Sequence, residues 1–373
     1  MPKPHQAEQV LLHLRYGNHD GAEKLLRAML KSEPRNPDVL LMLGVVHSKK
    51  GAQADAVAWF RKAIAADARH RDAWHNLAIA LSELGRDEEA LQASGKLLEL
   101  DPGNAQALLT RGVALQRLAR PEEALQTYDQ ALALQPGFAD AWINRGNTLK
   151  ELRRFDEALQ SHAKALELAP REAAAWLNRS LTLHAARRHA EAIEAAEKAV
   201  ELRPDFAQAQ WHLSLLRLQT GDYERGWQGY SWRWHYDTVN TRLRKFAQPL
   251  EGKRILVHAE QGLGDSLQFC RYVPLLAARG AQVIFETPPA LQALMRTLDA
   301  PGLTVAADGE ALPDFDLYCP LLSLPEAFGT RLETIPSAVP YLHAPEAAAA
   351  AWRETLSIPA DGAAERAPRI GLC

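Results

Sequence analysis

The sequence has few cysteines and no apolar stretch long enough to cross a membrane. Only three cysteines occur among 373 residues, and none lies in a CxxC motif or in a Cys/His pair with metal-ligand spacing. This excludes a disulfide framework and a thiolate zinc site, and it is typical of proteins from reducing compartments. The longest apolar runs, such as residues 40–46, are far shorter than the about 20 residues of a membrane-spanning helix. Residues 1–16 also lack a secretory signal. We therefore expect a cytoplasmic chain without membrane insertion.

An excess of charge of one sign is also lacking. The chain has 43 Lys and Arg against 46 Asp and Glu, which gives a formal net charge of -3, and no basic block interrupts this balance. Proteins that bind nucleic acid need a basic surface for the phosphates. We therefore expect no nucleic acid partner. The length predicts two or three units, at roughly 150 residues per domain.

What the sequence does contain is a repeat of 34 residues. Small residues, helix-stopping residues, large side chains and glycines each recur at this spacing. The small residues are Ala22, Ala56, Ala90, Ala124, Ala158, Ala192 and Gly226, and the helix-stopping positions are Pro34, Ala68, Pro102, Pro136, Pro170 and Pro204. The large side chains are Leu40, Trp74, Leu108, Trp142 and Trp176, and the glycines are Gly17, Gly51, Gly85 and Gly221. Seven such units account for residues 3–240 without an insertion.

Each unit has the pattern of a helical hairpin. Trp74, Leu77 and Leu81 share one helical face, because they follow each other at spacings of three and four. Gly85 permits the left-handed turn that ends this helix, and Pro102 ends the next one. A single hairpin cannot bury its own apolar face, whereas a stack of hairpins can. The repeat therefore predicts an α solenoid with a concave surface.

This pattern resembles the tetratricopeptide repeat family. The residues that carry the resemblance are Trp74, Ala78, Leu81, Ala90 and Pro102 in one unit and Trp142, Gly146, Leu149, Ala158, Ala165 and Pro170 in another. The resemblance covers residues 3–240 and implies seven helix-turn-helix repeats in a right-handed superhelix, with a protein or peptide as partner in the concave groove. The end units depart from the pattern, with Gln6 and Gln210 in the tryptophan phase.

A polar phase lies two residues after the large side chains. It contains Asn76, Thr110, Asn144 and Asn178, with Met42 and His212 at its ends. A carboxamide both donates and accepts hydrogen bonds, so a row of them can hold a peptide backbone without reading its side chains. The row resembles the asparagine ladder of O-linked N-acetylglucosamine transferases, which implies that these residues bind peptide. The alternative is that they are solvated helix residues without a ligand.

Four aromatic residues follow in the last repeat. Tyr223, Trp227, Tyr230 and Trp234 lie on one helical face, since their spacings are three and four. We expect a capping helix that packs against the next domain. A stacking platform for a sugar or a base is the alternative, but it lacks convergent polar groups.

The period changes from residue 250 onward. We expect strands at 254–259, 282–286, 303–306 and 315–318, helices at 266–279 and 290–298, and a loop at 260–265. This alternation predicts a parallel sheet with right-handed crossovers over residues 250–345. Residues 346–373 should contain a helix at 346–357, a linker at 359–368 and the start of another strand at 369–373.

Ligands of parallel sheets bind at the carboxyl ends of the strands. The first such end is followed by Gly262, Gly264 and Asp265. A dinucleotide-binding motif fails here, because Leu267 stands where its third glycine belongs, and no Walker lysine follows. The glycines would let the backbone approach a ligand closely. Asp265 at a helix N-terminus is either a ligand-facing carboxylate or simply an N-cap.

Residues 252–269 and 314–325 look like segments of bacterial repeat proteins that carry a glycosyltransferase domain of the heptosyltransferase type. The resemblance spans about 225–373 and implies that residues 250–345 are a Rossmann-like half-domain, the N-terminal, acceptor-binding half of a GT-B fold. It further implies metal-independent, inverting transfer from a nucleotide-sugar, which is a substrate, so that neither a cofactor nor a metal is expected. In this reading Asp265 is the general base, and Gly262, Gly264, Glu260 and His258 belong to the acceptor loop. The alternative for the last two is that His258 is a strand residue and Glu260 a loop residue bonded to backbone.

The donor-binding half implied by this family has no counterpart before Cys373. We therefore expect a fragment of a glycosyltransferase that is inactive by itself, because nothing in it would hold the diphosphate leaving group. The alternative is a non-catalytic scaffold that binds peptides or proteins.

Overall fold

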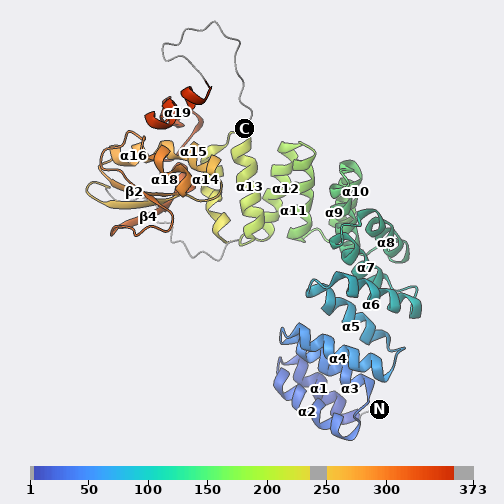
Figure 1. Ribbon diagram of the computed structural model, residues 1–373. Helices are drawn as coiled ribbons and strands as arrows, with labels where there is room; N and C mark the ends of the chain where they lie inside the picture. The colour runs from blue at the N-terminus through green and yellow to red at the C-terminus, as the bar shows by residue number, and fades with distance from the viewer. Residues whose placement is uncertain (1–3, 236–249, 357–373) are drawn as a thin grey trace. The chain divides into compact units, whose positions relative to one another are not determined.

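The computed structural model describes residues 4–235 and 250–356 (Figure 1). The chain forms two compact units, residues 1–206 and 207–373. Residues 236–240 at the end of the expected solenoid, the linker expected at 359–368 and the strand expected at 369–373 lie outside the described residues.

The first unit consists of paired helices that follow one another at the repeat spacing (Figure 1). The pairs are α1 (Pro4–Arg15) and α2 (His19–Ser32), α3 (Pro37–Lys49) and α4 (Gln53–Ala66), α5 (Arg71–Glu83) and α6 (Asp87–Leu100), α7 (Ala105–Arg117) and α8 (Pro121–Leu134), α9 (Ala139–Glu151) and α10 (Phe155–Leu168), and α11 (Ala173–Ala185) and α12 (His189–Leu202). A seventh pair, α13 (Ala207–Gln219) and α14 (Tyr223–Tyr230), lies in the second unit. The helical hairpins predicted from the repeat are therefore confirmed.

The repeated residue types have distinct structural roles. The small residues of the second helices, from Ala22 to Ala192, are fully buried, as close helix packing requires. The indole N–H groups of Trp74, Trp142 and Trp176 each donate to a backbone carbonyl six residues earlier, at distances of 2.9, 2.9 and 3.0 Å. These acceptors belong to the helix-stopping positions, so each tryptophan also fixes the turn that precedes its helix.

The turn inside each hairpin requires a left-handed residue. Gly85 has a φ of 69°, and Gly17, Gly51 and Gly221 are also left-handed. Ala119, Arg153 and Arg187 replace glycine with φ values of 55°, 59° and 60°. An L-residue in this region costs about 1–2 kcal/mol. The stack therefore imposes the turn even where the sequence disfavours it.

The two helices of a pair also match a small residue on one helix with a large ring on the other. Glycine on the first helix faces a ring on the second helix in three repeats, at Gly44 and Phe60, Gly112 and Tyr128, and Gly146 and His162. A Cβ atom on Gly146 would lie 2.5 Å from the His162 ring. The glycines therefore provide the space that the rings fill.

His162 is the polar member of this series. Its side chain is fully buried, and its Nε2 lies 3.1 Å from the hydroxyl of Thr182. That hydroxyl donates to the carbonyl of Asn178, so Nε2 is the donor to Thr182. Burial lowers the pKa of His162 to about 4, and the positive charges of Lys150 and Arg179 act in the same direction.

The second unit contains a four-stranded parallel sheet in the order β3-β2-β1-β4 (Figure 1). The strands are β1 (Arg254–His258), β2 (Gln282–Thr287), β3 (Thr304–Ala307) and β4 (Leu317–Pro320). One face of the sheet packs on a core that includes Val257, Phe285 and Leu276. The parallel sheet is thus confirmed, with β4 starting two residues later than expected.

The helices of this unit depart from the sequence prediction. The expected helix 266–279 is divided into α15 (Leu263–Phe269), a 3₁₀ turn at Cys270–Tyr272 and α16 (Val273–Ala278), and Pro274 lies in the first turn of α16. The loop at 260–265 was predicted too long, because Gly262 caps α15. The helix expected at 290–298 is only α17 (Gln292–Met295), preceded by a 3₁₀ turn. The remaining helices are α18 (Leu324–Ala327) and α19 (Glu346–Leu356).

The aromatic residues of α14 pack against the α/β part of the same unit. Trp227 meets Phe269 edge to face, with ring centroids 6.1 Å apart. Tyr230 packs on the core beneath the sheet. These contacts support the packing role that we expected for this helix.

We predict that His162 makes the chain acid-sensitive. The unfolded chain binds a proton near pH 6.5 and the folded chain only near pH 4, so stability is complete above pH 6.5 and falls by up to about 3 kcal/mol as the pH drops to 4. The variant His162→Phe should lose this component, because a phenylalanine already fills the equivalent position against Gly44. Urea unfolding of both proteins between pH 7.5 and 4 measures the difference. An unchanged pH dependence in the variant would show that other groups are responsible.

Candidate functional site

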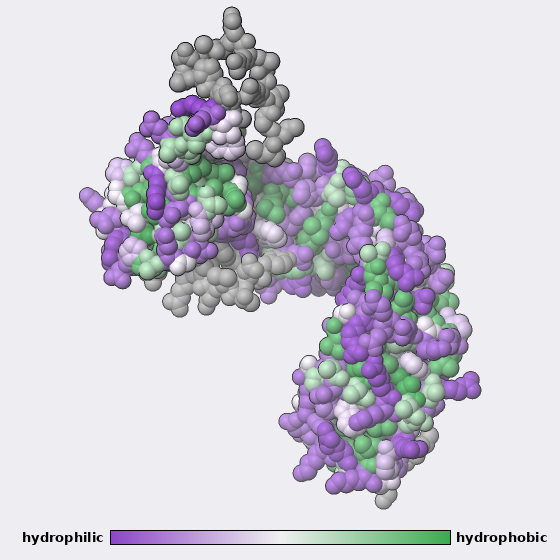
Figure 2. Space-filling model, in the orientation of Figure 1, coloured by the Kyte–Doolittle hydropathy of each residue, from purple (hydrophilic) through white to green (hydrophobic). Residues whose placement is uncertain are grey.

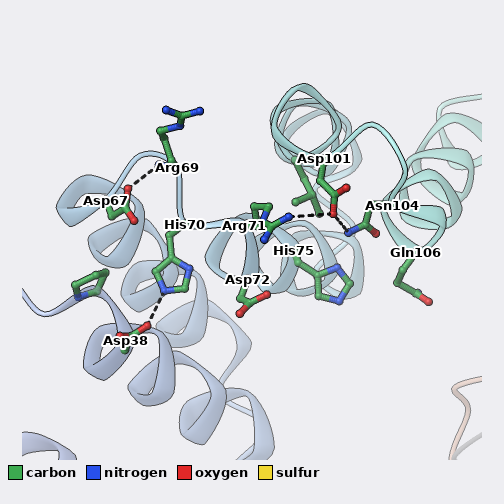
Figure 3. Close-up of a pocket in the computed structure, with 12 residues that line it drawn as sticks. Asp38, Asp67, Arg69, His70, Arg71, Asp72, His75, Asp101, Asn104 and Gln106 are labelled. Carbon is green, nitrogen blue, oxygen red and sulfur yellow. Dashed lines mark hydrogen bonds and ion pairs between the residues drawn. The ribbon is translucent and has the colours of Figure 1, made fainter. Parts of the chain in front are cut away.

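A polar groove crosses three consecutive repeats of the first unit (Figure 3). It has a volume of about 740 Å³ and lies between the N-terminal parts of α3, α5 and α7. Asp38 comes from α3, Asp72 and His75 come from α5, and Gln106 comes from α7. The turns before α5 and α7 complete the lining. The size is typical of ligand sites, which occupy about 300–1,000 Å³.

Several charges of the groove are already paired. Nε2 of His70 lies 3.2 Å from the Asp38 carboxylate. The guanidinium of Arg71 lies 3.8 Å from the Asp101 carboxylate, which also accepts the Asn104 amide at 3.2 Å. These pairs fix the walls of the groove and leave fewer charges for a ligand.

Asp72 and His75 occupy the middle of the lining. Burial lowers the pKa of His75, and the nearby Asp72 carboxylate opposes this shift without reversing it. His75 is therefore neutral near pH 7. Figure 3 shows Asp72 between His70 and His75, with no bond to another of the side chains drawn.

This groove was not predicted from the sequence, although a signal was present. Asp38, Asp72 and Asp140 share one phase, two residues before the large side chains. A repeated carboxylate in the first turn of a helix also has a structural reading, because it interacts favourably with the helix dipole. Only the stacking of three repeats shows that two of these carboxylates line one groove.

The asparagine row lies on the first helices of the repeats. The amide groups of Asn76 and Asn144 donate to the carbonyls of Asp72 and Asp140 in their own helices, at 2.8 and 2.9 Å. Asn178 is half-buried on α11. Thr110 is buried, and its hydroxyl donates to Gln106 in the same helix. Of the four residues predicted, three are thus half-buried asparagines, and Thr110 interrupts the row.

Two further grooves occupy equivalent repeat positions. One, of about 460 Å³, contains Trp74 and Leu81, and the other, of about 510 Å³, contains Trp176 and Leu183, three repeats later. Hydrophobic residues are exposed in patches among hydrophilic ones on the repeat helices (Figure 2). The rims carry ionic side chains such as Lys96. These grooves follow from the repeat itself.

A second group of predicted residues lies at the carboxyl end of β1. Asp265 is half-buried in the first turn of α15, and its Oδ2 accepts the Gly262 N–H at 3.1 Å. The N-cap of the helix is Gly262 and not Asp265, which corrects the alternative reading of this aspartate. Gly262 and Gly264 are both exposed. A Cβ on Gly264 would meet nothing within 4 Å, so packing does not require glycine there.

Glu260 has a structural environment. Its carboxylate accepts from Arg233 at 2.9 Å and from the Leu322 N–H at 3.1 Å, and the two side chains of the ion pair are only 10% and 6% exposed. Arg233 also donates to the Ser323 hydroxyl and the Tyr230 carbonyl. This buried network ties the segment after α14 to the end of β4.

His258 is likewise engaged. Its ring stacks on Tyr318, with centroids 4.8 Å apart, and its Nε2 lies 3.0 Å from the Tyr318 hydroxyl. Burial lowers the pKa of His258, whereas Asp308 opposes the shift. Burial and Asp308 raise the pKa of the neighbouring Glu286. Among the predicted residues at this edge, Asp265 thus keeps the carboxylate with the fewest protein contacts.

Comparison with known families decides what the helical repeats are. A model of the tetratricopeptide repeat matches residues 8–70, 109–170, 143–205 and 185–226, and a second model of this repeat matches 72–104. Together they cover more than half of the chain. The chain belongs to the tetratricopeptide repeat family. These matches end at residue 226, before β1.

Solved structures agree on the repeat fold. A tetratricopeptide repeat protein from Parabacteroides merdae is 21% identical, with a TM-score of 0.55 over 64% of this chain and 93% of that one. The Cut9–Hcn1 hetero-tetramer of the APC/C contains a chain that is 18% identical, with a TM-score of 0.52 over 62% of this chain and 46% of that one. At these identities the likeness shows the fold alone. The comparison with curated proteins finds no match.

Residues 4–235 and 250–356 contain neither a candidate membrane-spanning helix nor a cluster of metal ligands. None of the helices there combines the length and apolar character that crossing a membrane requires. No group of three or more metal-ligating side chains comes together in this part of the chain. Cys270 and Cys319 are buried free thiols.

We predict that Glu260 stabilises the α/β part of the second unit. The change Glu260→Ala leaves the buried Arg233 without its ion-pair partner and should cost about 3–5 kcal/mol. The control is Glu224→Ala, which breaks an exposed ion pair with Arg331 and should cost at most about 1 kcal/mol. Hydrogen exchange of the amides in β1 and β4 measures both. Equal protection in the two variants would contradict the structural role of Glu260.

Proposed function

We propose that this chain is a scaffold whose tetratricopeptide repeats bind a peptide or an unfolded segment of a partner protein. The observation that carries the proposal is the groove of about 740 Å³ across α3, α5 and α7. Its lining is polar and comes from three repeats, so an extended ligand can contact several repeats at once.

The asparagine row supports the same function farther along the stack. In Asn144 one amide N–H is used within the helix, which fixes the orientation of the carboxamide. The Oδ1 atom and the second N–H remain available for the N–H and C=O groups of a peptide backbone. A pre-oriented amide loses little rotational freedom when a ligand binds. Asn76 has the same arrangement on α5.

We expect the double variant Asn144→Ala and Asn178→Ala to bind peptide less tightly, because two backbone contacts are lost. Each contact is worth about 0.5–1.5 kcal/mol, so the dissociation constant should rise about fivefold or more. Fluorescence anisotropy with peptides selected from a random library on the whole chain measures it. The control is Gln126→Ala with Gln160→Ala, which removes two exposed carboxamides from the second helices. Equal affinity of the two double variants would exclude the asparagine row as a peptide site.

We propose a second candidate function for the α/β part, as the acceptor half of a GT-B glycosyltransferase. The carboxyl ends of its parallel strands carry Asp265, of which only Oδ2 has a hydrogen bond in the described part of the chain. Tyr230 lies near this carboxylate. The pKa of the Tyr230 phenol is raised, mainly by burial and to a smaller extent by the negative charge of Asp265. We propose Asp265 as the general base and Gly262, Gly264, Glu260 and His258 as parts of the loop around it.

In this reaction Asp265 takes the proton of an acceptor hydroxyl. The hydroxyl oxygen then bonds to the anomeric carbon of the nucleotide-sugar, and the bond from that carbon to the diphosphate oxygen breaks. The nucleoside diphosphate leaves with the electron pair. The described residues supply the acceptor side of this scheme, with the donor side contributed by a second half-domain.

The change Asp265→Asn tests this candidate. Asparagine keeps an oxygen for the Gly262 N–H but cannot take up a proton, so transfer should fall by about 10²–10⁴-fold. Release of nucleoside diphosphate from uridine- and adenosine-diphosphate sugars, with a peptide or glycan acceptor, measures it in a protein that also contains a donor-binding half. Full transfer by the variant would remove Asp265 as the base. Absence of transfer by that protein with Asp265 in place, with peptide binding intact, would favour the scaffold alone.

A further inference from the structure

We propose that the groove between α3, α5 and α7 selects peptides with a basic side chain, and that Asp72 accepts the lysine or arginine. This inference rests on the peptide-binding function proposed above and adds the chemistry of the ligand to it. The groove lining contains four aspartates against two arginines. A cation therefore gains more from entering it than an anion does.

The positions of the two arginines strengthen this asymmetry. Arg71 is engaged by Asp101 at 3.8 Å. Figure 3 shows Arg69 directed away from Asp72 and His75. An acidic peptide side chain would thus meet Asp72 without a free guanidinium beside it.

His75 does not cancel the negative charge of Asp72 near neutral pH. His75 is kept neutral by its burial, and His70 lies against Asp38. The carboxylate of Asp72 has no hydrogen-bond or ion-pair partner among the described side chains, and its backbone carbonyl is the acceptor of Asn76. Asp72 is exposed, so water occupies this carboxylate in the free chain. A lysine ammonium or an arginine guanidinium would replace that water with charge-assisted hydrogen bonds.

The chain offers a matched control for Asp72. Asp140 occupies the same position two repeats later, in the first turn of α9, and its carbonyl likewise accepts an asparagine amide at 2.9 Å. It does not line the groove. The changes Asp72→Asn and Asp140→Asn therefore remove the same helix-dipole interaction, and only the first removes a groove charge.

The test begins with a random library of 12-residue peptides selected on the whole chain. We expect lysine and arginine to be enriched among the bound peptides. The tightest basic peptide, and its analogues with glutamine or glutamate in place of the basic residue, are then titrated against the wild type and both variants. Asp72→Asn should weaken the basic peptide about two- to fivefold, and Asp140→Asn should leave its affinity unchanged. The glutamine analogue should bind both variants and the wild type alike.

Each other outcome overturns the inference in a distinguishable way. Peptides that bind without enrichment of basic residues, or that respond equally to both variants, would refute the role of Asp72 and leave peptide binding intact. A chain that selects no peptide would refute the proposed function together with this inference. Circular dichroism of both variants confirms that the helices are retained.

Discussion

The repeat part of the molecule depends on close contact between the two helices of each hairpin. The alanines that recur every 34 residues from Ala22 to Ala192 have no exposed surface. A Cβ on Gly146 would overlap the ring of His162. Such packing leaves little freedom in helix spacing, because protein interiors are as dense as organic crystals. Each hairpin therefore repeats the geometry of the previous one. Side chains in the same phase, such as Asp38 and Asp72, can then line one continuous groove.

The periodic features of this unit could be predicted from the sequence because each has a local cause. Proline ends a helix and glycine permits a left-handed turn, whatever the neighbours are. Arg153 and Arg187 show the limit of that reasoning, because they adopt the glycine conformation only through the packing around them. The same limit applies to Thr110. Its position in the repeat predicted a residue that binds peptide, but its hydroxyl donates to a carbonyl of its own helix. Packing between repeats decides these positions.

In the α/β part the sequence predicted the strands, the place of His258 in β1 and a backbone bond to Glu260, but not the side-chain partners of these residues. Glu260 and His258 both lie at the end of β1, as expected. Their partners, Arg233 and Tyr318, are 27 and 60 residues away in the chain. A spacing rule cannot identify contacts over such distances, since they depend on how the sheet is ordered. The parallel order β3-β2-β1-β4 brings β4 beside β1. This adjacency places Tyr318 against His258 and the Leu322 N–H against Glu260.

The polar groove shows why paired charges matter for selectivity as much as free ones. A surface of unpaired aspartates and arginines would attract ligands of either sign and bind each weakly, because solvent screens exposed charges. Here Asp101 already pairs with Arg71, and Asp38 with His70. An incoming group that competed with them would have to break an existing pair. A cation that binds Asp72 does not have to break an existing pair. The groove therefore favours a positively charged group at this position.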